Sequence, residues 1–67
     1  MGVELFKMIK IRELRQKVGI TQLELSERLR VGQSTVAMWE NGSNMPRSDK
    51  LPELAKALEC EVSDLFE

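Results

Sequence analysis

The chain has 67 residues, 42% hydrophobic and 31% charged, with four glycines and two prolines. This composition indicates one small, soluble and mostly helical domain over residues 1–67, and it excludes a disordered tail or a collagen-like repeat. One cysteine excludes an internal disulfide, and the absence of histidine removes the commonest metal ligand and general base. We therefore expect no metal site, no cofactor and no enzyme activity.

The first eleven residues, MGVELFKMIKI, mix Glu4, Lys7 and Lys10 into an apolar segment. A signal peptide needs an uninterrupted apolar core, and a transmembrane helix needs about 20 apolar residues, so this segment fits neither. We expect a cytoplasmic protein with no membrane partner.

Charge is distributed unevenly along the chain. The net charge of −1 is not the basic balance expected of a protein that binds a polyanion. However, eight basic and five acidic residues lie in residues 1–47, whereas two basic and six acidic residues lie in residues 48–67. The positive excess is therefore confined to the first two thirds of the chain.

The first predicted helix begins near Lys7 or Met8 and ends at Val18. Its apolar stripe consists of Ile11, Leu14 and Val18 at three- and four-residue spacing, and Gly19 suits a left-handed stop.

A second helix is predicted from Thr21 to about Leu29. Thr21 and Glu24 have the spacing of a capping box, in which each side chain bonds the backbone N–H of the other residue. Leu25 and Leu29 are expected in the core, and the Ser26 hydroxyl is expected to bond back to the Gln22 carbonyl.

A third helix, Gln33 to Glu40, follows after only a few residues. Val36 and Trp39 should face the core, and Asn41-Gly42 should end the helix. Two helices joined by so short a turn cross at a steep angle, as in a DNA-reading helix-turn-helix.

A fourth helix is predicted from about Asp49 to Leu58 with Ser48 as its cap, and a short fifth helix from Asp64 to Glu67 with Ser63 as its cap. Cys60 occupies an apolar position and is expected to be a small buried residue. The expected fold class is all-α, with five helices around one core.

These segments resemble the Cro/repressor (XRE-type) helix-turn-helix family, most of all the N-terminal DNA-binding domains of phage repressors. The resemblance covers residues 8–66, and its most specific parts are Trp39-Glu40-Asn41-Gly42, Pro46 and the leucine-rich LPELAKALE that starts at Leu51. It implies a five-helix, lambda-repressor-like domain that binds double-stranded DNA as a homodimer. The third helix would enter the major groove of a palindromic operator, and the expected role is that of a transcriptional regulator, in most relatives a repressor.

The outward face of the third helix supplies the candidates for base reading, which are Gln33, Ser34, Ala37 and Met38. A glutamine amide can donate and accept together at the edge of adenine, and small or pliant apolar groups can contact a thymine methyl. Met38 could instead close over the core beside Trp39.

The resemblance also implies a set of residues that contact DNA phosphates. They are Gln22, Thr35, Asn41, Ser43, Asn44 and Arg47. Gln22, at the start of the second helix, could offer a phosphate its amide and its backbone N–H. Thr35 could instead support the first turn of the third helix.

Two further sets of residues have structural roles in the family. Arg15 and Glu40 are expected to form an ion pair between the first and third helices. Val62, Leu65 and Phe66 are candidates for the dimer interface, although they could equally belong to the core.

The sequence departs from the family at Arg30, where a glycine usually makes the turn, at Gly32, which replaces a serine cap, and at Ser26, which replaces alanine. Either Arg30 is left-handed at some cost, or Gly32 absorbs the strain. A protein-interaction module, such as an antitoxin, anti-repressor or scaffold, is the alternative function, and the acidic C-terminal part of the chain favours it.

Overall fold

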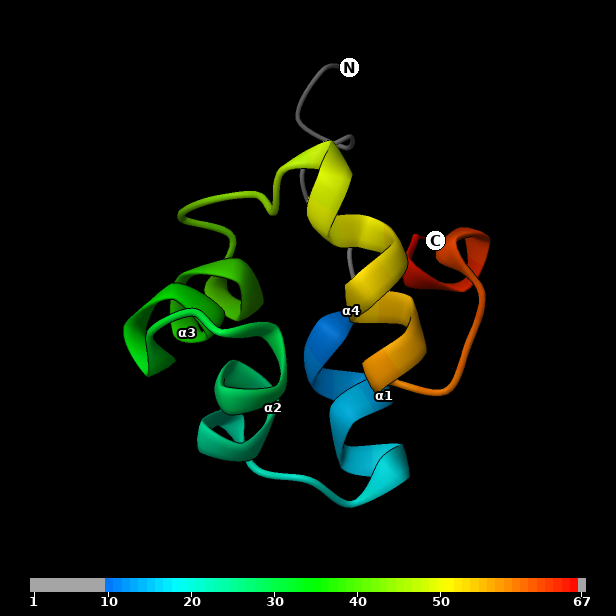
Figure 1. Cartoon of the computed structure of the whole chain (residues 1–67), viewed down its shortest axis with the longest axis horizontal. Coiled ribbons are helices and arrows are strands. Elements are labelled where there is room, and N and C mark those ends of the chain that lie inside the picture. The colour runs from blue at the N-terminus through cyan, green and yellow to red at the C-terminus, as the bar shows by residue number, and fades with distance from the viewer. Residues whose placement is uncertain (1–9, 67) are drawn as a thin grey trace.

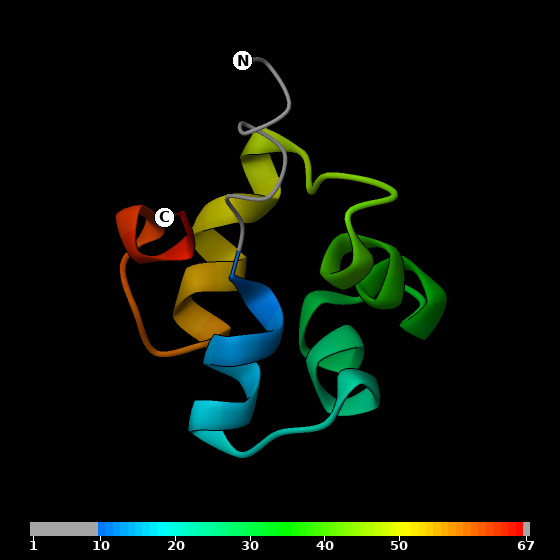
Figure 2. The same cartoon turned by 180° about the vertical axis from the view of Figure 1, so that it is seen from behind.

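The computed structural model describes residues 10–66, which form four α-helices and two 3-10 helices. In chain order these are α1 (Ile11–Val18), α2 (Gln22–Leu29), α3 (Gln33–Asn41), η2 (Ser48–Lys50), α4 (Leu51–Ala57) and η3 (Val62–Leu65). Figures 1 and 2 show α2 and α3 on one side, and α1, α4 and η3 on the other. The all-α class is confirmed, but the prediction of five α-helices is wrong.

Helix α1 begins later than its apolar stripe predicted. A start at Lys7 or Met8 lies outside the described residues, and Lys10, with φ −109° and ψ 43°, is not helical. The other end is as predicted, because Gly19 is left-handed with φ 89° and its N–H donates to the Arg15 carbonyl.

The capping box of α2 is confirmed. The Thr21 N–H donates to Glu24 Oε1 over 2.8 Å, and the Glu24 N–H donates to Thr21 Oγ1 over 3.0 Å. Ser26 is buried as expected, but its hydroxyl donates to the Leu23 carbonyl at 2.7 Å and not to Gln22. The bond therefore runs three residues back along the helix.

The turn between α2 and α3 is made by a left-handed Arg30. Its φ is 59°, and its N–H donates to the Glu27 carbonyl over 3.2 Å. Gly32 has an extended backbone (φ −75°, ψ 153°) that any residue could adopt, so it absorbs no strain. The left-handed conformation of Arg30 costs about 1–2 kcal/mol relative to the right-handed helical region.

One apolar core joins all four α-helices. Val36 and Trp39 of α3 are 0% and 4% exposed, so the predicted inward face of this helix is confirmed. They pack with buried residues of the other elements, chiefly Ile11, Leu25, Leu29, Leu54, Leu58 and Leu65. Helix α3 is thus fixed to the body of the domain along one side.

The C-terminal part differs in detail from the prediction. The predicted fourth helix is divided, because η2 precedes an α-helix that starts at Leu51 and carries Pro52 in its first turn, where a missing N–H costs nothing. The predicted fifth helix is one 3-10 turn that starts at Val62 and is capped by Glu61 instead of Ser63. Cys60, predicted to be a small buried residue, is only half-buried.

The burial of η3 decides between core and interface for one of the three dimer candidates. Leu65 is 0% exposed and belongs to the core of its own chain, so it has no surface to offer a partner. Phe66 is half-buried against the core, whereas Val62 is 37% exposed.

A buried carboxylate ties α3 to α1 and α2. The side chain of Glu40 is 0% exposed, and its Oε2 accepts from Arg15 Nε at 2.6 Å. Its Oε1 accepts from Gln22 Nε2 at 3.0 Å and, over a longer 3.4 Å, from Arg12 Nε. Arg15 also donates to the Ile20 carbonyl at 2.9 Å, so the guanidinium braces the connection between α1 and α2.

Burial is the largest single influence on the pKa of Glu40, and it acts to raise that pKa. The hydrogen bonds from Arg15, Gln22 and Arg12, with the positive charge of Arg15, together outweigh it. The pKa of Glu40 therefore lies below the ordinary value of 4.5. The carboxylate stays ionised at neutral pH.

We expect Glu40→Ala to lower the free energy of unfolding by about 3 kcal/mol, because Arg15 would keep a largely buried charge without its partner. The matched control is Glu27→Ala on the exposed side of α2, expected to change stability by no more than about 0.5 kcal/mol. Urea unfolding of both variants measures the difference. Equal midpoints for the two would contradict the role of Glu40.

The same pair predicts how stability depends on pH. Because the folded-state pKa of Glu40 is lowered, its stabilisation is fully present above the ordinary value of 4.5 and is lost as pH falls through the folded-state pKa. Thermal unfolding of the wild type and of Glu40→Gln should therefore differ most at neutral pH, and the difference should shrink on acidification. A difference that stays constant with pH would show that ionisation of Glu40 is not the source.

Candidate nucleic-acid interface

The outward face of α3 carries the four predicted base-reading residues. Gln33 and Ser34, in the first turn of α3, are exposed, Met38 is 37% exposed and Ala37 is half-buried. The exposure of Met38 favours the outward position over closure onto Trp39. The four side chains share the side of α3 opposite the buried Val36 and Trp39, which is the arrangement that a groove-reading helix requires.

The side chain of Gln22 connects the buried ion pair to this face. Its amide nitrogen donates to Glu40, which leaves its Oε1 to accept from Gln33 Nε2 over a long 3.5 Å. One N–H of the Gln22 amide is thus engaged with Glu40, and the expected contact of Gln22 with a phosphate stays a prediction. In this conformation the amide also contacts Gln33, the first residue of α3.

The start of α2 still has donors for a phosphate. The capping box uses the backbone N–H groups of Thr21 and Glu24. Among residues 10–66, no acceptor bonds the N–H groups of Gln22 and Leu23, which lie between them. Unsatisfied N–H groups at the positive end of a helix suit an anionic oxygen.

The connection after α3 places the remaining phosphate candidates on the surface. Asn41 Oδ1 accepts from the Ser43 N–H at 2.8 Å, and Asn44 Oδ1 accepts from the Met45 N–H at 3.0 Å, so both amides are held by local turns, and both residues are exposed. Arg47 is 85% exposed, with Asp49 at 3.8 Å.

Thr35 is half-buried, and its N–H donates to the Gly32 carbonyl at 3.0 Å. Gly32 provides no side-chain cap for α3, as its identity predicted. Thr35 therefore lies within the first turn of α3, and both of its expected roles stay predictions.

Arg12 is a basic residue near this surface that the sequence patterns did not reveal. Its side chain is 60% exposed, and its Nε shares Glu40 Oε1 with the Gln22 amide. Arg12 therefore lies beside the start of α2. Because Arg15 already balances the charge of Glu40, the positive charge of Arg12 is uncompensated there. No sequence motif marks this position, because the proximity arises from the packing of α1 against α3.

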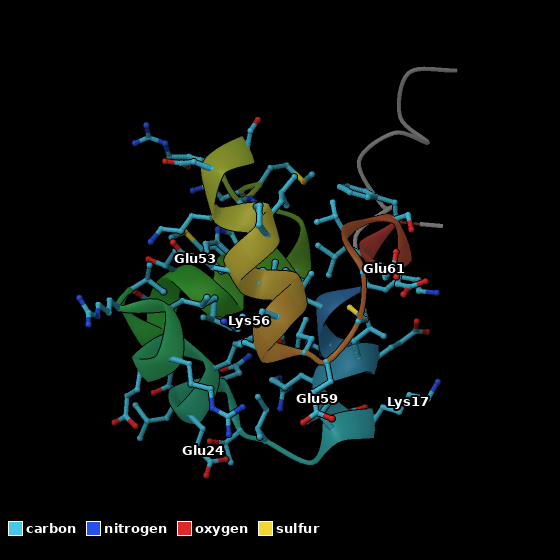
Figure 3. All side chains as sticks on the ribbon, turned by 45° about the vertical axis from the view of Figure 1, so that its right-hand side comes forward. Lys17, Glu24, Glu53, Lys56, Glu59 and Glu61 are labelled. Carbon is cyan, nitrogen blue, oxygen red and sulfur yellow. The ribbon has the colours of Figure 1, made fainter. Side chains whose placement is uncertain are left out.

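Lys10, just before α1, and Lys17, within α1, lie away from this surface. Together with Glu59 and Asp64 they line a hollow between α1 and the C-terminal end of α4. Figure 3 shows Lys17 near Glu59 and apart from Glu24 at the start of α2. Neither lysine adds to the surface around Gln22.

The described part of the chain contains no cluster of three or more residues suited to holding a metal ion. None of its helices has the length and apolar character needed to cross a membrane.

Comparisons with known proteins agree with this arrangement. A family model described as helix-turn-helix matches residues 11–65, which is most of the chain. An uncharacterized HTH-type transcriptional regulator from Archaeoglobus fulgidus is 33% identical over 57 residues, covering 85% of this chain and 81% of the relative. The residues that the family model matches include α2 with its capping box, the turn at Arg30 and the exposed face of α3. The chain therefore belongs to the helix-turn-helix family, of the XRE type that its sequence resembles.

Proposed function

We propose that this chain is a sequence-specific DNA-binding transcriptional regulator that inserts α3 into the major groove. The observation that carries the proposal is the outward face of α3, where Gln33 and Ser34 are exposed in the first turn while Val36 and Trp39 anchor the opposite side. Membership of the helix-turn-helix family, and the description of the relative as a transcriptional regulator, support it.

In this proposal the bases are read by neutral groups. The Gln33 amide would face the N6 and N7 atoms of adenine, Ser34 would donate to a base or a phosphate, and Ala37 and Met38 would contact a thymine methyl. Gln22 contributes indirectly, because its bond to Gln33 restricts the orientation of that amide before DNA arrives.

The phosphate contacts surround this face. The free N–H groups at the start of α2 would hold one phosphate, with Arg12 beside them. Asn41, Ser43, Asn44 and Arg47 would follow the backbone on the other side of α3, and Thr35 would support the first turn. Such contacts position the protein but carry no sequence information.

The regulator would act as a homodimer on a palindromic operator, most simply as a repressor that blocks transcription by occupancy. Two copies of α3 would then lie about 34 Å apart, one turn of DNA. Val62 and Phe66 remain the interface candidates from η3, since Leu65 is inside the core.

Selection from randomised duplexes tests this function directly. The expected outcome is an enriched site with two inverted half-sites whose centres are one helical turn apart. A single asymmetric site would remove the dimer from the proposal. If no sequence were enriched at low salt, the protein-interaction function would replace DNA binding.

Replacing Gln33 tests base reading. We expect Gln33→Ala to weaken binding to the selected site by about 1–3 kcal/mol and to relax the preference at one base pair of each half-site, with little change for random DNA. Lys17→Ala, on the far side of α1, is the control. Binding to single-base variants of the site is the measurement, and an unchanged preference would exclude Gln33 as a base reader.

Replacing Arg12 and Arg47 tests phosphate contacts. Each change to alanine should reduce the slope of log affinity against log salt by about 0.9, because one phosphate contact is lost, and should leave base preference unchanged. The salt slope separates this role from support of Glu40, since a purely structural effect would lower affinity equally at every salt concentration. Lys17→Ala again serves as the control.

A further inference from the structure

The side of α4 that faces α2 contains a basic hollow. It is lined by Arg28 and Leu29 at the end of α2, by the turn residue Arg30, and by Lys50, Glu53 and Lys56 of η2 and α4. Figure 3 shows Glu53 and Lys56 on α4, away from Glu24 at the opposite end of α2. The hollow therefore lies at the other end of α2 from the N–H groups proposed to hold a phosphate.

Two of these basic side chains already bond carbonyl groups at the ends of helices. Lys50 Nζ donates to the Leu29 carbonyl at 3.3 Å and pairs with Glu53 at 3.5 Å, while Arg28 Nη1 reaches the Ala57 carbonyl at 3.5 Å. These contacts have a structural explanation, because cations stabilise the negative ends of helices. No bound ligand is needed to explain the positions of these two side chains.

The other two basic side chains have no such explanation. Within residues 10–66, no hydrogen bond or ion pair involves the side chain of Arg30 or Lys56, and both residues are exposed. Arg30 is left-handed, at a position where glycine would remove the strain. An arginine retained in a strained conformation, with its guanidinium free beside three other cations, is a candidate for binding.

We propose that this hollow binds an acidic polypeptide segment of a partner protein. Its cations match carboxylates, and the half-buried Ala57 adds a little apolar surface. The carbonyl oxygens at the ends of α2 and α4 distinguish a polypeptide from DNA. A phosphodiester has only acceptor oxygens, which these carbonyls repel, whereas a polypeptide supplies carboxylates for the cations and N–H groups for the carbonyls.

This inference does not depend on the proposed function, because it uses a different surface. A regulator could bind DNA through α3 and an acidic partner through the hollow at the same time. The two binding events can therefore be followed separately in one protein.

Chemical-shift titration of the full chain with blocked hexaglutamate provides the test. We expect saturable shifts at the amides around Arg28, Arg30 and Lys56, weaker shifts with tripolyphosphate, which lacks N–H donors, and none with hexaglutamine. Shifts spread evenly over all surface cations, stronger binding of tripolyphosphate, or no shift at millimolar peptide would each overturn the proposal.

Variants that preserve the fold complete the test. Arg30→Gly removes the charge and also relieves the left-handed strain, so a loss of binding cannot be ascribed to unfolding. Combined with Lys56→Gln it should weaken hexaglutamate binding about tenfold, because two charge contacts are lost. Lys17→Gln is the matched control and should bind as the wild type does. Wild-type affinity in the double variant would refute the site.

A titration with the selected DNA duplex separates this proposal from the DNA-binding one. DNA should shift the amides of Gln22 and Gln33 and spare the hollow. DNA shifts centred on Arg30 and Lys56 would overturn the hollow as a polypeptide site. Peptide binding without any DNA binding would instead overturn the proposed function and leave the hollow standing.

Discussion

The carboxylate of Glu40 is the point at which three helices meet. It is fully buried, and its oxygens accept from Arg15 and Arg12 of α1 and from Gln22 of α2. A charge buried this deeply is tolerated only with good partners, so its donors restrict the position of α3 strongly. The apolar contacts of Val36 and Trp39 attach α3 to the core, and the Glu40 network adds directional bonds that attach it to two named neighbours.

This network links the exposed face of α3 to the interior of the domain. Gln22 donates to Glu40 with one end of its amide and accepts from Gln33 with the other. A side chain on the exposed face is therefore linked, through one intermediate, to the buried ion pair. The contact with Gln33 is long, at 3.5 Å, and exposed, so it is weak beside the 3.0 Å bond from Gln22 to Glu40.

Much of the fold could be predicted from the sequence, because local signals agreed with one another. The capping box at Thr21, the inward pair Val36 and Trp39, and the left-handed Gly19 each follow from short-range rules and are confirmed. The C-terminal helix could not be predicted from such rules. The burial of Leu65 in the core, which depends on tertiary packing, fixes one 3-10 turn there, and the local bond from the Glu61 N–H to Asp64 Oδ2 caps it.

The candidate site was predictable where it depends on helical periodicity and not where it depends on packing between helices. Exposure of Gln33 and Ser34 follows from the position of Val36, whereas the role of Gln22 and the proximity of Arg12 depend on where α1 and α2 place their side chains around Glu40. A family resemblance indicates that a residue lies near DNA. It does not reveal which of its atoms are already in use.

A net charge of −1 is unusual for a protein that binds DNA, and the position of each charge bears on this point. Formal charge counts every cation equally, yet Arg15 is neutralised by Glu40, and Arg28 and Lys50 reach the carbonyl ends of helices. Of the described cations, Arg12 and Arg47 are those placed to meet phosphates around α3 in the proposed complex. Much of the binding would then come from neutral donors, namely amides, hydroxyls and helix N–H groups, which release no counterions. Such an interface could recognise DNA without a basic chain, provided that its donors are held in place, and the buried carboxylate of Glu40 holds one of them, the Gln22 amide.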